Sequence, residues 1–166
     1  MTDRLQGIRA VARVLIQDEE GNLLLCRSAD GKAWVPPGGT IDQGENFATA
    51  AVREAMEEVG LPVELGPLAY LQEFRPAHRD EHVIEVAFRA RALASHPVEE
   101  RAVPSGPAEA PWSAWQIEDL DGPRRLVRWF SQAAVQELSD PVYPASLKDQ
   151  FWKDGAPGYL GLVQGR

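Results

Sequence analysis

Cysteine is almost absent from this chain of 166 residues, which contains only Cys26. A single cysteine excludes an internal disulfide and a zinc site built from several cysteines of one chain. We therefore expect a reducing, cytoplasmic setting. Long apolar runs are missing as well, because charged residues such as Asp3 and Arg13 interrupt the N-terminal 17 residues. This segment predicts neither a signal peptide nor a transmembrane helix, and we expect no membrane association.

Positive charge is scarce. The chain has 17 Lys and Arg residues against 25 Asp and Glu residues, a formal net charge of −8. This sign disfavours binding to a DNA or RNA polymer, which relies on basic side chains to replace counterions. An acidic protein that acts on a phosphorylated substrate needs cations between the two negative partners. The composition therefore makes a bound metal ion an early hypothesis.

The size and balance of the chain are those of one globular domain, spanning residues 1–166. Apolar residues make up 44% of the sequence and charged residues 25%, which suits a packed core. Apolar runs bounded by turn residues predict strands over residues 8–16, 23–26, 33–35, 68–74, 82–92 and 112–117.

Two segments have helical features. Residues 46–59 lack Gly and Pro, begin at a potential N-cap, Asn46, and are followed by Gly60. Residues 124–138 place apolar side chains along one side of a second, amphipathic helix. The proline-rich residues 95–111 predict a long loop, and the chain after residue 141 shows no regular pattern.

The first predicted helix groups three carboxylates. Glu54, Glu57 and Glu58 are spaced i, i+3, i+4 and so share one face within about 100°. The apolar residues expected on the opposite face, against a sheet, are Ala48, Val52, Ala55, Met56 and Val59. Crowded carboxylates repel one another, and a hard divalent cation such as Mg²⁺ or Mn²⁺ offsets that repulsion. The alternative is an acidic helix face that is simply solvated.

A wider pattern decides between these readings. It comprises Gly39, five residues, Glu45, seven residues, Arg53-Glu54, two residues, Glu57-Glu58, one residue, Gly60 and the apolar Leu61. Residues 39–61 thereby match the signature of the Nudix hydrolase family at every specified position. From average residue usage, such a match arises by chance on the order of once per 10⁹ to 10¹⁰ starting positions. The segment closely resembles that family, which favours a metal site over a solvated face.

The resemblance implies a fold and a reaction. Nudix hydrolases have an α/β (α+β) fold, an α/β/α sandwich with a mixed β-sheet between helices. They cleave the diphosphate linkage of small nucleoside diphosphate derivatives with Mg²⁺, for which Mn²⁺ can substitute. It further implies that Glu57, Glu58 and the Gly39 carbonyl bind metal, and that Glu54 is a ligand or the base. Glu54, Glu58 and Arg53 would form the catalytic group.

Two further glutamates are candidates for the site. Glu45 would arrive from the loop before the helix, while Arg53 pairs with a carboxylate and holds the geometry. Family members often draw another glutamate from a distant loop, for which Glu99, Glu100 and Glu109 are available. We favour Glu109 because it lies just before the strand predicted from Trp112. For each of the three, a solvated loop position is the simpler alternative.

The substrate is less specified by sequence. Pro76 lies 15 residues beyond Leu61, where members acting on ADP-ribose often have a proline, so ADP-ribose or a nucleotide sugar is slightly favoured. The short segment before residue 39 instead resembles the branch that hydrolyses oxidised nucleoside triphosphates. A non-catalytic nucleotide sensor is disfavoured because all four signature glutamates are present. A decapping-type activity is disfavoured by the acidic charge, and monomer and homodimer both remain open.

Overall fold

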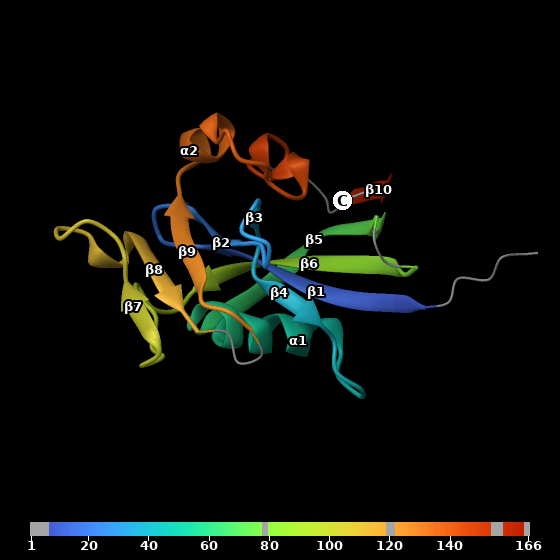
Figure 1. The fold of residues 1–166 in the computed structure, drawn as a ribbon, viewed down its shortest axis with the longest axis horizontal. Helices are drawn as coiled ribbons and strands as arrows, with labels where there is room; N and C mark the ends of the chain where they lie inside the picture. Colours follow the sequence, from blue (N-terminus) through green and yellow to red (C-terminus); the bar gives the residue numbers. More distant parts are fainter. Residues whose placement is uncertain (1–6, 78–79, 119–121, 154–157, 165–166) are drawn as a thin grey trace, which may run out of the picture.

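The computed structural model describes residues 7–77, 80–118, 122–153 and 158–164, and a mixed ten-stranded sheet forms its centre (Figure 1). The strands are β1 (Ile8–Gln17), β2 (Leu23–Arg27), β3 (Trp34–Val35), β4 (Gly38–Thr40), β5 (Val63–Arg75), β6 (His82–Ala92), β7 (Ala102–Pro104), β8 (Ala114–Ile117), β9 (Arg125–Phe130) and β10 (Gly158–Gln164). Their order is β10-β5-β6-β1-β2-β9-β8-β7, with β3 paired to β2 and β4 paired to β1. The pairs β1–β6 and β5–β10 are parallel and the others are antiparallel.

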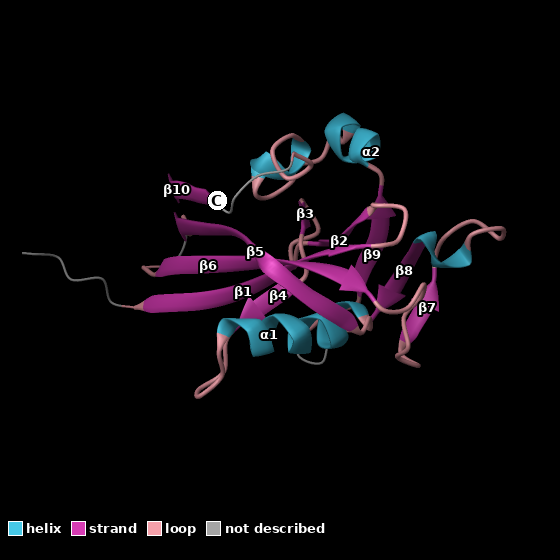
Figure 2. Cartoon of the chain, turned by 180° about the vertical axis from the view of Figure 1, so that it is seen from behind, coloured by secondary structure: helices cyan, strands magenta, loops and turns pink. Residues whose placement is uncertain are grey.

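Helices cover both faces of this sheet, as Figure 2 shows from behind. They are α1 (Phe47–Glu54), the π-helical turn η1 (Ala55–Val59), the 3₁₀ turns η2 (Pro111–Ser113) and η3 (Ala145–Lys148), and α2 (Gln132–Glu137). One apolar core lies between α1 and the sheet, and a second lies under α2 and η3. The predicted mixed sheet between helices is confirmed. No helix in the described ranges is long and apolar enough to span a membrane.

The helix predicted over residues 124–138 is wrong in its first half. Residues 125–130 form β9, which pairs with β2 on one side and β8 on the other, and only α2 is helical. Val127 and Phe130 are buried in the two different cores, because an odd separation in a strand places side chains on opposite faces. The short apolar pattern fitted a helical stripe equally well, and pairing on both sides favours the strand.

The C-terminal part is more regular than predicted. After residue 141 the chain forms η3 and then β10, which adds to the edge of the sheet in parallel with β5. Leu147 and Phe151 are buried in the second core. β10 pairs with a strand more than 80 residues earlier, so its existence depends on a non-local partner that a local pattern does not show.

The boundaries of two other segments also differ from prediction. β5 begins at Val63, five residues before the predicted start, and passes Gly66 and Pro67 through a register shift between Leu65 and Leu68. A bulge therefore absorbs residues that read as a strand break. The predicted loop at 95–111 contains the short edge strand β7.

Cys26 provides a direct test of this packing. Its side chain is fully buried on β2, and burial, followed by the charge of Glu58, raises the pKa of the thiol to about 12. We expect the folded protein to resist a thiol reagent such as DTNB at mildly alkaline pH, since neither access nor thiolate is available. The urea-unfolded chain should release one equivalent of chromophore. Rapid labelling of the folded chain would show that the core around β2 is wrongly packed.

Candidate active site

The acidic helix begins and ends where the sequence predicted. The Asn46 side chain accepts a hydrogen bond from the Thr49 N–H at 2.9 Å and so caps the first turn of α1. At the other end Gly60 has φ +73°, a left-handed conformation that glycine adopts without strain. The helix is continuous through η1, so Glu54, Glu57 and Glu58 project from one rigid element.

Side chains of the β7–β8 hairpin hold the last turn of this helix. Residues in η1 are wound more loosely than in an α-helix, and such turns are frequent at functional sites. The Arg101 guanidinium donates to the Glu57 carbonyl at 2.8 Å, and the buried Trp115 indole donates to the Val59 carbonyl at 3.1 Å. These contacts fix the end of the helix that carries Glu57 and Glu58.

The orientation of the helix corrects the predicted apolar face. Ala48 and Val52, predicted to pack against the sheet, are exposed. Glu54 and Glu58, read as part of the open acidic face, are instead 7% and 5% exposed. The inward face is a regular helical stripe made of Phe47, Ala50, Ala51, Glu54, Ala55, Glu58 and Val59. The two carboxylates are tolerated on it because polar groups of β4 and nearby arginines contact them.

Glu54 lies directly against the glycine turn. A Cβ atom on Gly39 would come within 2.5 Å of the Glu54 Oε1 atom, so only a glycine allows this approach. Loss of solvent around the carboxylate, reinforced by the charge of Glu58, raises the pKa of Glu54 to about 7, although Arg53 opposes the shift. Gly39, whose carbonyl the family resemblance names as a metal ligand, thus lies directly beside Glu54 of the acidic helix.

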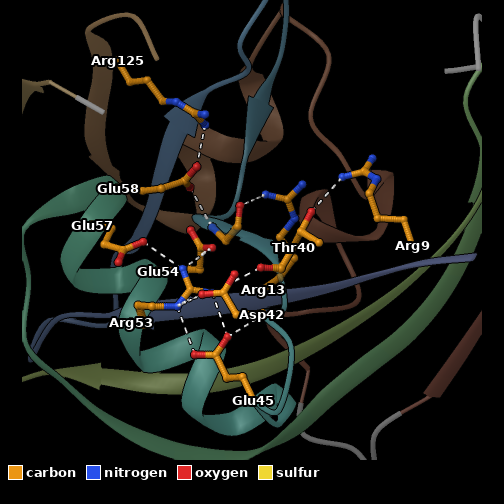
Figure 3. Close-up of polar contacts among 11 residues, drawn as sticks. Arg9, Arg13, Thr40, Asp42, Glu45, Arg53, Glu54, Glu57, Glu58 and Arg125 are labelled. Carbon is orange, nitrogen blue, oxygen red and sulfur yellow. Dashed lines mark hydrogen bonds and ion pairs between the residues drawn. The ribbon is translucent and has the colours of Figure 1, made fainter. Parts of the chain in front are cut away.

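Glu58 is held between a backbone amide and an arginine. Its Oε2 atom accepts from the Gly38 N–H at 2.8 Å, and its Oε1 atom lies 2.8 Å from Nη1 of Arg125 (Figure 3). Gly38 has φ +146°, and a Cβ there would lie 2.1 Å from the Ala12 carbonyl oxygen. The turn can therefore present its N–H to Glu58 only with glycine at this position.

Arg53 joins the remaining carboxylates, as Figure 3 shows. Its guanidinium donates to Glu45 at 3.0 and 2.9 Å, to Glu54 at 2.9 Å and to Glu57 at 2.8 Å. Hydrogen bonding to Glu45 is the main reason that the pKa of Arg53 lies above its ordinary value, and Arg53 in turn lowers the pKa of Glu45. The predicted pairing of Arg53 with a carboxylate is found, and it extends to four, because Nε of Arg53 also lies 3.7 Å from Oδ2 of Asp42.

The sequence did not single out two arginines that reach this group. Arg125 was placed in the predicted second helix, and its position on β9 brings it to Glu58. Arg13 on β1 donates to the Gly38 carbonyl at 2.8 Å and to Glu85 at 3.0 Å. The sequence signal for Arg13 is a charged residue inside an apolar run, which by itself indicates only that the N-terminal segment is not a signal peptide.

The proposed loop ligand Glu109 does not join the carboxylates in this structure. It is exposed, in the loop between β7 and β8, and in Figure 1 that loop extends away from α1. Arg101, at the other end of the hairpin, is the residue that contacts η1. Glu99, another of the three loop candidates, lies beside the end of the acidic helix, since a Cβ on Gly60 would meet the Glu99 Cβ at 3.2 Å.

The donor set suits a hard divalent cation, because carboxylate and carbonyl oxygens are the ligands that Mg²⁺ and Mn²⁺ prefer. Glu54, Glu57 and Glu58 are turned toward Arg53 or Arg125, and within the described ranges no three His, Cys, Asp or Glu side chains converge on one point. The carboxylate of Glu54, buried beside Gly39, fits a site that a cation would stabilise, since burial and the neighbouring Glu58 disfavour its charged form.

Comparisons with known proteins agree with this geometry. A family model described as NUDIX domain matches residues 7–141. A MutT-like protein of Streptomyces ambofaciens is 28% identical over 157 residues, which cover 95% of this chain and 84% of that protein. A putative 8-oxo-dGTP diphosphatase of Bacillus subtilis (strain 168) is 37% identical over 70 residues, covering 42% of this chain and only 46% of that protein.

The fold is also similar to that of a solved NUDIX hydrolase. The crystal structure of a NUDIX hydrolase from Nitrosomonas europaea superposes with a TM-score of 0.64 at 19% sequence identity. The superposition covers 97% of this chain and 81% of the other. At this level of identity the likeness establishes the architecture.

The two glycines of the turn should fail in different ways. Gly38→Ala places a Cβ against backbone of β1 at an unfavourable φ, so we expect the free energy of unfolding to fall by about 2 to 5 kcal/mol. Gly39→Ala meets only the end of the Glu54 side chain, so we expect a small loss of stability but about ten- to hundredfold slower turnover. Gly7→Ala, with no atom within 4 Å, is the control. Urea denaturation and initial rates measure both quantities, and equal behaviour of the two turn variants would contradict this assignment.

Proposed function

Because this chain belongs to the Nudix family and is a Nudix hydrolase, we propose that it hydrolyses the diphosphate linkage of a small nucleotide-type substrate in a Mg²⁺-dependent reaction. The observation that carries the proposal is the glycine turn closed over two buried carboxylates. Gly38 donates to Glu58 and Gly39 leaves room for Glu54, within a signature whose glutamates are all present.

Glu57, Glu58 and the Gly39 carbonyl would hold the divalent cation, with Glu54 as a further ligand or as the base. Such a cation lowers the pKa of bound water and neutralises charge on phosphoryl oxygens. Glu57 is the most accessible of these carboxylates, with 34% of its side chain exposed, so it can exchange its contact with Arg53 most readily. Arg53 would still be held by its hydrogen bond to Glu45.

Arg53 and Arg125 are suited to stabilise the site before and after metal binding. Each guanidinium neutralises carboxylates that would otherwise repel one another at short range. A guanidinium can also pair with phosphate oxygens, so Arg53 and Arg125 would have donors available for the substrate once a cation neutralised their carboxylate partners. Glu45 is a supporting residue that holds Arg53, and Glu109 has no role here that its position supports.

Two substrate classes compete. Pro76 favours ADP-ribose or a nucleotide sugar. The name of one relative, putative 8-oxo-dGTP diphosphatase, favours a nucleoside triphosphate as the second candidate. The formal charge of −8 weighs against a nucleic-acid polymer as substrate. Both favoured classes contain a diphosphate that a metal ion can bridge to the acidic helix.

A substrate panel tests the reaction. We expect one of ADP-ribose, a nucleotide sugar, a dinucleoside polyphosphate or a (d)NTP, including 8-oxo-dGTP, to be cleaved at its diphosphate linkage with Mg²⁺. Coupled phosphatase release detects the products, and EDTA should abolish turnover until Mg²⁺ or Mn²⁺ is restored. A protein inert toward the whole panel with either metal would contradict the proposed reaction.

Replacement of Glu58 tests its role. Glu58→Gln keeps an acceptor for the Gly38 N–H but removes the charge, so we expect turnover to fall about 10² to 10⁴-fold without loss of fold. Glu64→Gln is the matched control, since Glu64 is exposed on β5 and pairs with Arg91. Protection of Cys26 from DTNB verifies folding. Wild-type turnover in Glu58→Gln would remove Glu58 from the mechanism.

A further inference from the structure

A chain of buried and part-buried hydrogen bonds links the second core to the glycine turn. The Tyr70 hydroxyl donates to Oε1 of Glu85 at 2.9 Å, and Nε of Arg13 donates to Oε2 of the same carboxylate at 3.0 Å. Arg13 then donates to the Gly38 carbonyl, and the Gly38 N–H donates to Glu58. Tyr70, Glu85 and Arg13 lie outside the signature, yet their contacts end on one of its carboxylates.

Arg13 binds the turn at more than one point. Its Nη1 atom lies 2.8 Å from the Gly38 carbonyl oxygen and 3.2 Å from the Pro36 carbonyl oxygen. The backbone beside it adds a third contact, from the Val14 N–H to the Pro37 carbonyl at 3.0 Å. Three successive carbonyls of the turn are thus bound to β1, and the guanidinium binds two of them.

The ion pair that holds Arg13 includes a buried carboxylate. Glu85 is 2% exposed, and the Tyr70 residue beside it is 5% exposed. A buried ion pair generally stabilises a fold no more than apolar side chains of similar volume do. Its location beside Gly38 therefore points to a role in geometry, because a guanidinium bonds carboxylate and carbonyl groups along fixed directions.

A second ion pair, beside the same strands β1 and β6, serves as a natural control. Arg9 on β1 and Glu81 next to β6 repeat the Arg13–Glu85 arrangement four residues earlier, with Nε 2.8 Å from Oε2. This pair is more exposed, at 35% and 18% of the side chains against 19% and 3%. Arg9 reaches the Thr40 hydroxyl at 3.4 Å and not a carbonyl of the turn (Figure 3).

We propose that Arg13, oriented by Glu85 and Tyr70, is a positioning residue that fixes the Gly38 peptide and thereby sets Glu58 in place for the divalent cation. The inference rests on the proposed metal-dependent reaction. Arg13 acts through the turn, since Gly38 presents its carbonyl to Arg13 and its N–H to Glu58. When ligands are already held in place, metal binding does not have to order them. Loss of the paired contacts that the Arg13 guanidinium makes should therefore weaken metal affinity.

Mn²⁺ binding to the protein without nucleotide tests this role. Free Mn²⁺ is followed by electron paramagnetic resonance during titration. We expect Arg13→Lys and Glu85→Gln to bind Mn²⁺ about 10- to 100-fold more weakly than wild type. Lysine cannot reproduce the paired contacts of the Arg13 guanidinium, and glutamine removes the charge that orients it. Tyr70→Phe removes one supporting hydrogen bond and should weaken binding about 2- to 10-fold. Arg9→Lys should stay within about threefold of wild type.

Turnover measured against Mn²⁺ concentration separates positioning from catalysis. Raising Mn²⁺ should restore most of the turnover of Arg13→Lys, because the Glu58 carboxylate is still present, but should not restore Glu58→Gln. The proposal is overturned if Arg13→Lys and Glu85→Gln bind Mn²⁺ like wild type, or if Arg9→Lys is weakened as much as they are. If Arg13→Lys does not fold, Glu85→Gln and Tyr70→Phe decide by the same comparison.

The outcome is distinguishable from failure of the proposed function. A wild-type protein that binds Mn²⁺ but cleaves no diphosphate would refute the reaction, while the ranking of Mn²⁺ affinities would still test Arg13. A wild-type protein that binds no Mn²⁺ would refute both.

Discussion

The site depends on one close approach, that of a glycine backbone to two buried carboxylates. Glu54 presses against Gly39, and Glu58 accepts the Gly38 N–H from the same turn. A Cβ on Gly39 would meet the Glu54 carboxylate, and a Cβ on Gly38 would meet the backbone of β1, so the two glycines determine how the acidic helix docks on β4. The rest of the molecule supports this contact. The turn pairs with β1 through β4, β1 lies within the sheet, and α1 packs its alanines against the sheet.

Negative charge at the site is balanced internally. A carboxylate that loses water without a partner would be protonated or would move out to solvent. Here Arg53 contacts three glutamates, and Arg125 contacts Glu58. The chain is acidic overall, yet it places basic side chains where carboxylates are most crowded. A divalent ion that binds to the acidic side chains would therefore take over contacts that arginines make in its absence.

Sequence and structure agree best where the pattern is local. Asn46, Gly60 and the shared helix for the signature glutamates follow from capping and spacing, and the family resemblance supplied the mixed sheet. The burial of Glu54 and Glu58 could not be predicted from the sequence. Helical periodicity assigns carboxylates to the solvent-facing side and contains no information on the turn that covers them. β9, β10 and the contacts of Arg125 depend on partners far along the chain, which a window of neighbouring residues does not contain.

The tethering of η1 by the β7–β8 hairpin means that the signature is not self-sufficient. The carbonyls at the end of the acidic helix are occupied by the Arg101 and Trp115 side chains, which come from about 40 to 60 residues downstream. A segment transplanted into another scaffold with only residues 39–61 would leave those acceptors without their donors. A transferred signature segment would therefore need the β7–β8 hairpin as well as the helix, although the hairpin contributes no signature residue.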